Sequence, residues 1–220
     1  MIKALVFDLD GTLVDTLGDI ATLMNGYLRS KGWPEHSVEA YKRMVGRGLS
    51  NLIREAIPTA HVHKLLELYP EVYASYVAMD TGNSLPYPGV PETLAKLASH
   101  GIHMAVVSNK PDLITRNMVD KLFPSVRFAF VRGGLDGKPS KPDPTSTLEA
   151  AQACGVHPSE CAFVGDSDID MKTALAASMR AIGAAWGFRG EQELRQAGAD
   201  IILDSMVDLP ALLEKNQDVR

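Results

Sequence analysis

Residues 3–13 read KALVFDLDGTL, and the predicted fold follows from this segment. Residues 4–7 form a short apolar run, which is typical of a strand buried on both faces of a sheet. Asp8 and Asp10 come directly after the run, and Gly11 then allows a tight turn. We therefore expect a strand of a parallel sheet that carries Asp8 at its carboxyl end.

The two acidic residues of this segment can act together. Alternate residues of an extended chain point the same way, so Asp8 and Asp10 can present two carboxylates to one site. Carboxylates so close raise the proton affinity of one of them unless a cation intervenes, which allows one to act as an ionised nucleophile and the other to carry a proton. An Asx-type turn would explain an isolated Asp-x-Asp, but Asp-Leu-Asp-Gly-Thr-Leu after a buried strand is more specific.

Strand and helix patterns alternate along most of the chain. Further apolar, β-rich runs predict strands at residues 103–108, 128–131, 161–164, 180–184 and 200–203. Helical spacing predicts helices between them at residues 91–99, 112–122, 145–154 and 169–177. This alternation predicts an α/β fold with a parallel sheet covered by helices on both faces.

Residues 15–85, which we call the inserted segment, interrupt the alternation. They contain no convincing buried strand, and their patterns predict helices at residues 17–31, 37–44, 49–55 and 61–79. Turn-forming residues at 81–83 and 86–89 suit a hinge or linker at the exit. We predict a core domain of residues 1–14 and 86–220, with an all-helical domain of residues 15–85 inserted after the first strand.

Composition excludes several classes of protein. The 220 residues carry 22 Lys and Arg against 27 Asp and Glu, and this net charge of −5 argues against a general nucleic-acid binder. No run approaches the ~18 apolar residues of a membrane span, and a charge near the N-terminus is unlike a signal peptide, so we expect a soluble cytoplasmic protein. Cys154 and Cys161 lack metal-ligand spacing and are predicted to pack in the interior, in a reducing compartment.

Two later segments can bind an anion. Ser108-Asn109-Lys110 closes a predicted strand before a helix, where a hydroxyl and free helix amides offer hydrogen-bond donors, although a simple helix cap explains this segment alone. Lys141 stands in a stiff Lys-Pro-Asp-Pro frame and can contact a phosphoryl oxygen and a carboxylate together. Alone it would be an ordinary surface lysine. Lys138, in a Gly-rich stretch, is predicted to be solvated.

The segment Gly-Asp-Ser-Asp-Ile-Asp at residues 165–170 can bind a metal ion. Its acids could merely compensate the dipole of the following helix. However, Gly165 fits a carboxylate at position 166 that must reach a metal at the sheet edge. Oxygen ligands from Asp8, Asp166 and a carbonyl are typical of a hard cation, best Mg²⁺, and Asp170, one helical turn beyond, could support its bound waters.

Together, these segments resemble the motifs of the haloacid dehalogenase superfamily of phosphohydrolases, over nearly the whole chain. The resemblance implies a Rossmann-like core and a helical cap formed by the inserted segment. It implies that Asp8 is the nucleophile, Asp10 the acid/base and Lys141 a catalytic residue. The resemblance also implies that Asp8, Asp10 and Asp166 bind Mg²⁺ and that Asp170 supports its bound waters. It further implies that phosphate or substrate is bound by Thr12, Ser108 and Asn109.

Within the superfamily, the chain most resembles phosphoglycolate phosphatases. The features that carry this resemblance are Asn109-Lys110 after Ser108, the frame around Lys141 and the small cap. The implied activity is Mg²⁺-dependent hydrolysis of a small phosphorylated metabolite through an aspartyl-phosphate. Arg47, between Gly46 and Gly48, is a candidate to bind a substrate carboxylate, since a guanidinium suits an oxyanion; an exposed arginine at a helix junction is the alternative.

Three other functions stay open at this point. A phosphomutase similar to β-phosphoglucomutases, or a pyrophosphatase, would use the same nucleophile. A receiver-like signalling domain also carries a phosphorylated aspartate, but it leaves the inserted segment and Asp10 unexplained. Dinucleotide binding has little support because Gly-x-Gly-x-x-Gly does not follow the first strand. The sequence is compatible with a monomer or a homodimer.

Overall fold

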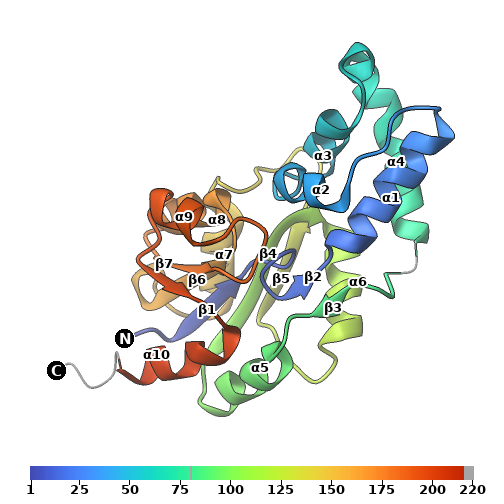
Figure 1. Cartoon of the computed structure of the whole chain (residues 1–220). Coiled ribbons are helices and arrows are strands. Elements are labelled where there is room, and N and C mark those ends of the chain that lie inside the picture. Colours follow the sequence, from blue (N-terminus) through green and yellow to red (C-terminus); the bar gives the residue numbers. More distant parts are fainter. Residues whose placement is uncertain (80, 216–220) are drawn as a thin grey trace.

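The computed structural model describes residues 1–79 and 81–215. Its main sheet has six parallel strands in the order β5-β4-β1-β6-β7-β8. Their bounds are β1 Ala4–Phe7, β4 His103–Pro111, β5 Phe130–Gly134, β6 Cys161–Gly165, β7 Arg180–Ala184 and β8 Ile201–Leu203. Because β1 lies between β4 and β6, the residues that follow it emerge near the middle of the carboxyl edge (Figure 1).

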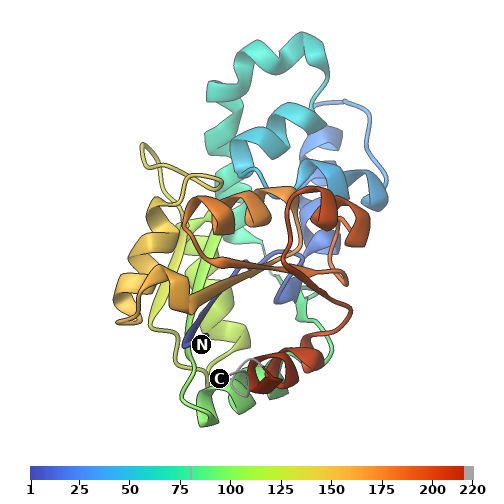
Figure 2. The ribbon, with the colours of Figure 1, turned by 90° about the vertical axis from the view of Figure 1, so that its left-hand side faces the viewer.

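Helices cover both faces of this sheet, as the alternation predicts (Figures 1 and 2). Leu5 and Phe7 of β1 share one apolar cluster with residues of three helices: α5 Val90–Ser99, α6 Asp112–Leu122 and α10 Leu209–Lys215. Ala4 and Val6 share a second cluster with residues of α7 Thr145–Ala153, α8 Asp168–Ala176 and α9 Glu191–Gln196. The run in β1 is therefore uniformly apolar because both of its faces are buried, and the α/β fold is confirmed.

The inserted segment forms helices with an apolar cluster of their own. They are α1 Leu17–Ser30, α2 Val38–Met44, α3 Leu49–Ala56 and α4 Leu65–Ala78, and they lie together beyond the carboxyl edge of the sheet, blue to teal in Figure 1. Met24, Tyr41, Ile53 and Val72 are fully buried among them. The single helix predicted at 61–79 is wrong in its first turn, because residues 59–64 form a tighter 3₁₀ helix after Pro58.

Two very short strands join the inserted segment to the sheet. β2 (Val14–Asp15) pairs antiparallel with β3 (Leu85–Pro86), and we call this pair the connecting ribbon. Beside it, Asp19 accepts hydrogen bonds from Asn83 Nδ2 at 3.1 Å and Ser84 Oγ at 2.6 Å. The entry and exit of the inserted segment are thus held side by side. The predicted boundaries fall in this ribbon, and the division into two domains stays a prediction.

The structure also bears on the cysteines and on membranes. Cys154 and Cys161 are both buried and not in a disulfide, and they pack in the second cluster as predicted. Within residues 1–79 and 81–215, no helix has the length and apolar character that a membrane span requires.

Candidate active site

The carboxyl edge of the sheet brings the predicted site residues together. Asp8 directly follows β1, Ser108 lies within β4, and Asp166 directly follows β6. Lys141 comes from the loop between β5 and α7. All four side chains belong to buried residues. This edge is where open parallel sheets bind ligands, because the loops after neighbouring strands converge there.

Lys141 is held between two carboxylates. Its Nζ lies 2.8 Å from Asp8 Oδ1 and 2.7 Å from Asp170 Oδ1, and its side chain is 2% exposed. Burial lowers the pKa of Lys141, but the charges of Asp170 and Asp8 outweigh burial and raise the pKa above its ordinary value. The ammonium therefore stays charged and can bind a phosphoryl oxygen next to Asp8.

Three carboxylates form a group that could hold a metal ion. One oxygen each from Asp8, Asp166 and Asp170 lies within 4.8 Å of the others. Burial raises the pKa of Asp8 to about 7 and the pKa of Asp166 well above its usual range. If all three carboxylates ionise, they and the ammonium of Lys141 leave two negative charges in a buried place, which only a cation would balance. A divalent cation with a preference for oxygen, such as Mg²⁺, fits this donor set.

Two glycines leave the space that Asp166 occupies. A Cβ built on Gly11 would overlap the Asp166 carboxyl group, and one built on Gly187 would overlap the Asp166 Cβ. Gly11 also has a φ of +81°, which side chains rarely adopt. The backbone N–H of Phe188 donates to Asp166 Oδ2 at 2.7 Å, so one oxygen of this carboxylate is fixed and the side chain has a single orientation.

Asp170 is fixed through both of its oxygens. Its Oδ2 accepts hydrogen bonds from the Ser167 N–H at 3.1 Å and from the Ser167 hydroxyl at 2.7 Å. These bonds cap the N-terminus of α8. Its Oδ1 accepts from Lys141 Nζ. The structure therefore places Asp170 against Lys141 as well as within the group of carboxylates. Its predicted support of metal-bound waters stays a prediction.

We expect Gly165→Ala to displace Asp170 and disturb Lys141. The added methyl group would overlap the Cβ and carboxyl group of Asp170, so the variant should lose about 1–3 kcal/mol of unfolding free energy. Chemical denaturation measures this loss. Gly26→Ala is the matched control, because Gly26 lies in α1 with open space around it, and this variant should gain up to about 1 kcal/mol. Equal stability of the two variants would contradict the packing argument.

Asp10 does not belong to this group of carboxylates and pairs instead with Lys110, to which the motifs assigned no role of its own. Lys110 Nζ donates to Asp10 Oδ1 at 2.9 Å, and it also donates to the hydroxyl of Tyr76 on α4. The motif gives the position of Lys110 after Asn109. It contains no pattern that predicts the burial of Lys110 by α4, which is distant in sequence. Lys110 engages only Oδ1 of this carboxylate, and metal binding by Asp10 stays a prediction.

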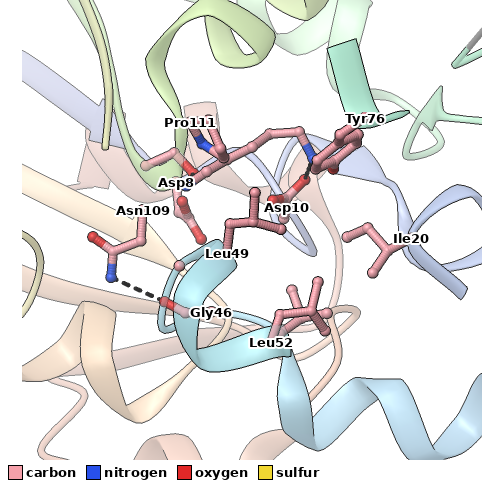
Figure 3. A pocket seen from close by; sticks show the side chains of 13 residues that line it. Asp8, Asp10, Ile20, Gly46, Leu49, Leu52, Tyr76, Asn109 and Pro111 are labelled. Carbon is pink, nitrogen blue, oxygen red and sulfur yellow. Dashed lines mark hydrogen bonds and ion pairs between the residues drawn. The ribbon is translucent and has the colours of Figure 1, made fainter. Parts of the chain in front are cut away.

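A small cavity lies between this edge and the inserted helices (Figure 3). Asp8 and Asp10 face it from the sheet, and Leu49 and Leu52 of α3 face it from the opposite side. Its volume is about 30 Å³, whereas a single water needs ~10–15 Å³. With the inserted helices in this position, the cavity is small compared with a phosphate ester.

Ser108 and Asn109 have different surroundings. Ser108 lines the cavity, and its Oγ accepts from the Lys110 N–H at 3.3 Å. The Asn109 amide bonds to backbone: Oδ1 accepts from the Lys141 N–H at 2.8 Å, and Nδ2 donates to the carbonyl of Lys141 at 3.0 Å. Nδ2 also donates to the carbonyl of Gly46 at 3.0 Å, as Figure 3 shows. Asn109 thus fixes the backbone of Lys141 and touches the inserted segment. Substrate binding by both residues stays a prediction.

Two further candidates do not line the cavity. The Thr12 hydroxyl is buried and has no hydrogen-bond partner among residues 1–79 and 81–215. The Arg47 side chain is 55% exposed and pairs with Asp168 Oδ2 at 3.4 Å. Its neighbours Gly46 and Gly48 do line the cavity. The predicted contacts of Thr12 and Arg47 with substrate stay predictions.

Comparison with known proteins identifies the class. The family described as Haloacid dehalogenase-like hydrolase matches residues 5–184, and the chain belongs to this family. The resemblance inferred from the motifs is thereby confirmed, and hydrolase membership favours an enzyme over a receiver-like signalling domain.

Individual relatives cover most of the chain. A phosphoglycolate phosphatase from Photorhabdus laumondii subsp. laumondii is 34% identical over 94% of this chain and 91% of its own length. One from Pseudomonas putida is 31% identical over 96% of this chain and 78% of its own. A solved structure from Lactobacillus delbrueckii subsp. bulgaricus, provisionally described as a phosphoglycolate phosphatase, has a TM-score of 0.85 at 31% identity and covers 96% of this chain and 98% of its own.

Proposed function

We propose that this protein is a Mg²⁺-dependent phosphatase that hydrolyses a small phosphate monoester, with phosphoglycolate as the first candidate substrate. The contact between Asp8 and Lys141, within the buried group of carboxylates, carries the proposal. This contact brings together a carboxylate that could act as the nucleophile, a charged ammonium and oxygens that could hold a cation. The names of the similar phosphatases support the choice of substrate.

The proposed reaction has two displacements at phosphorus. Asp8 forms a bond to phosphorus while the bond to the leaving oxygen breaks, and Asp10 gives its proton to that oxygen. Asp10 then takes a proton from a water that attacks phosphorus, the Asp8–phosphorus bond breaks, and inorganic phosphate leaves. Lys141 and the Ser108 hydroxyl bind the equatorial oxygens, where charge accumulates in such reactions.

The oxygens of Asp8 and Asp166 would hold Mg²⁺, together with the backbone carbonyl of Asp10. When bound, the ion would neutralise the surplus negative charge and polarise the transferring phosphoryl group. Asp170 would hold Lys141 and not bind phosphate itself, because both of its oxygens already accept hydrogen bonds.

We expect stabilisation by Mg²⁺ to increase with pH. Burial raises the pKa of Asp8 to about 7, against about 4 in an unfolded chain, so without metal Asp8 stabilises the fold below pH ~4 and this contribution is lost as pH rises through 7. Mg²⁺ binds the deprotonated carboxylates in place of the proton. The difference in Tm between Mg²⁺ and EDTA should be near zero at low pH and reach about 5 °C at pH 7.5.

Thermal unfolding from pH 4.5 to 8 measures this difference. Asp166→Asn, which removes one carboxylate of the group, should lose the gain from Mg²⁺. Asp143→Asn is the control, because Asp143 lies exposed in the loop beside Lys141 and outside the group. A gain of the same size at every pH would argue against binding to these carboxylates.

A substrate screen tests the proposed function. Phosphoglycolate, hexose phosphates, nucleotides, pyrophosphate and p-nitrophenyl phosphate are compared by kcat/KM with Mg²⁺ and with EDTA. The proposal expects Mg²⁺-dependent phosphate release, greatest for a small monoester. Transfer of label between two positions of a hexose phosphate without phosphate release would instead indicate a phosphomutase, and preference for pyrophosphate would indicate a pyrophosphatase.

A further inference from the structure

We propose that Lys110 and Tyr76 are positioning residues that hold the Asp10 carboxylate in the orientation required for proton transfer, and that they do so when α4 lies against the sheet. The inference rests on the proposed function, in which Asp10 is the acid/base. It adds two residues to that site, one from β4 and one from the inserted segment.

Lys110 fixes one oxygen of Asp10. The Lys110 side chain is 1% exposed and that of Asp10 is 10% exposed, and the distance from Nζ to Asp10 Oδ1 is 2.9 Å. A charge-assisted hydrogen bond in such a buried place is strong and directional. Asp10 Oδ2 is left as the oxygen that exchanges the proton, on a carboxylate that lines the cavity beside Asp8.

Lys110 is not required to hold the other charged groups of the site. Lys141 already pairs with Asp8 and Asp170, at 2.8 Å and 2.7 Å. The two buried lysines therefore have separate partners, one at the nucleophile and one at the acid/base. Because Lys110 bonds to Asp10 and not to Asp8, its removal should affect proton transfer more than the attack on phosphorus.

Tyr76 completes the surroundings of the Lys110 ammonium. Its hydroxyl accepts a hydrogen bond from Nζ, which also lies 4.8 Å from the centre of its ring. Burial raises the pKa of Tyr76 to about 12, so the hydroxyl is neutral at physiological pH. Tyr76 and Asp10 lie next to each other in Figure 3, one from the inserted segment and the other from the sheet edge.

This contact links the position of α4 to Asp10. Tyr76 of α4 lines the cavity of about 30 Å³ together with Asp8 and Asp10, so α4 would open this edge to substrate by withdrawing from it. Withdrawal removes Tyr76 and exposes the ammonium to water, where its attraction to Asp10 falls several-fold because the dielectric constant rises. The return of α4 restores the contact and excludes water at the same time. Asp10 is thus positioned for proton transfer only in the closed arrangement.

The leaving group distinguishes this role from a structural one. A p-nitrophenolate ion departs without a proton, whereas an alkoxide from an alkyl phosphate needs one from Asp10. If Lys110 positions Asp10, its loss slows leaving-group release from an alkyl phosphate much more than from p-nitrophenyl phosphate. If Lys110 only supports the fold or the cavity, its loss slows both reactions by the same factor.

The test compares Lys110→Met and Tyr76→Phe with the unaltered chain, in single-turnover experiments with Mg²⁺. For Lys110→Met, we expect release of glycolate from phosphoglycolate to fall about 10²-fold and release of p-nitrophenolate to fall less than about 10-fold. Tyr76→Phe removes one hydroxyl without leaving a large void. It should also slow glycolate release more than p-nitrophenolate release, with a loss of glycolate release of about 10-fold.

Two control variants match these substitutions. Lys138→Met alters an exposed lysine, and Tyr73→Phe alters a half-buried tyrosine of the same helix that stacks on Tyr69, so both should behave like the unaltered chain. An equal loss on both substrates, or no loss, overturns the inference. If Lys110→Met does not fold, Tyr76→Phe decides alone. Failure of the unaltered chain to hydrolyse either substrate would refute the proposed function itself.

Discussion

Asp8→Asn should abolish Mg²⁺-dependent release of phosphate from p-nitrophenyl phosphate, with a loss of about 10⁴-fold or more. The amide cannot form the acyl-phosphate bond, and it also removes one of the three carboxylates that surround the proposed cation site. Asparagine has nearly the same shape as aspartate. The substitution also removes a carboxyl group whose pKa is raised by burial, so the folded chain does not lose a favourable charge. The fold should therefore persist, as circular dichroism and the thermal transition will show.

The control for this experiment is Asp168→Asn. Asp168 stands two residues after Asp166 in the sequence, but its carboxylate pairs with Arg47 and Lys172 and does not belong to the group of carboxylates. Its replacement should lower activity by less than about 10-fold. Retained activity in Asp8→Asn, with a purified protein free of other phosphatases, would overturn the assignment of the nucleophile.

Lys141→Met should lower kcat by about 10³-fold and also destabilise the protein. The ammonium is the buried partner of both Asp8 and Asp170, so its removal leaves two carboxylates close together without a counter-charge. Breaking such a buried pair costs about 3–5 kcal/mol of unfolding free energy, and the lost contact with the phosphoryl group accounts for the fall in kcat.

The destabilisation should depend on solution conditions. It should be greatest without metal at neutral pH, where the carboxylates repel each other, and smaller at pH 5 or with Mg²⁺. Denaturation by urea at two pH values, with and without Mg²⁺, measures it. Lys138→Met serves again as the control, since that lysine is exposed in a loop. A Lys141→Met protein with unchanged kcat would show that this lysine does not take part in catalysis.

Local patterns were sufficient to predict the sheet and the segments at its carboxyl edge. The strands of the sheet are buried on both faces, so they are written as short, uniformly apolar runs. Such runs, β1 first among them, can be recognised in the sequence without any tertiary information. The polar residues then converge because parallel strands end at one edge. Asp8, Lys141 and Asp166 meet in the structure for this reason, whereas their catalytic and metal-binding roles remain predictions.

Other features had no local pattern to reveal them. The strands of the connecting ribbon are two residues long, too short to show a period, and α9 has only Leu194 buried. The contact of Lys110 with Tyr76 depends on how α4 packs against the sheet. Asn109 resembles a phosphate ligand in its motif, but the packed loop around Lys141 engages its amide. These features arise from tertiary packing.

The connecting ribbon has a consequence for how such a chain could change in evolution. Val14 pairs with Pro86 and Asp15 with Leu85, so about seventy residues leave the sheet and return to it at nearly one point. A segment that enters and leaves at adjacent points can be lengthened, exchanged or deleted without moving any strand of the sheet. The six parallel strands can therefore keep their chemistry while the helices above them diverge to accept different leaving groups.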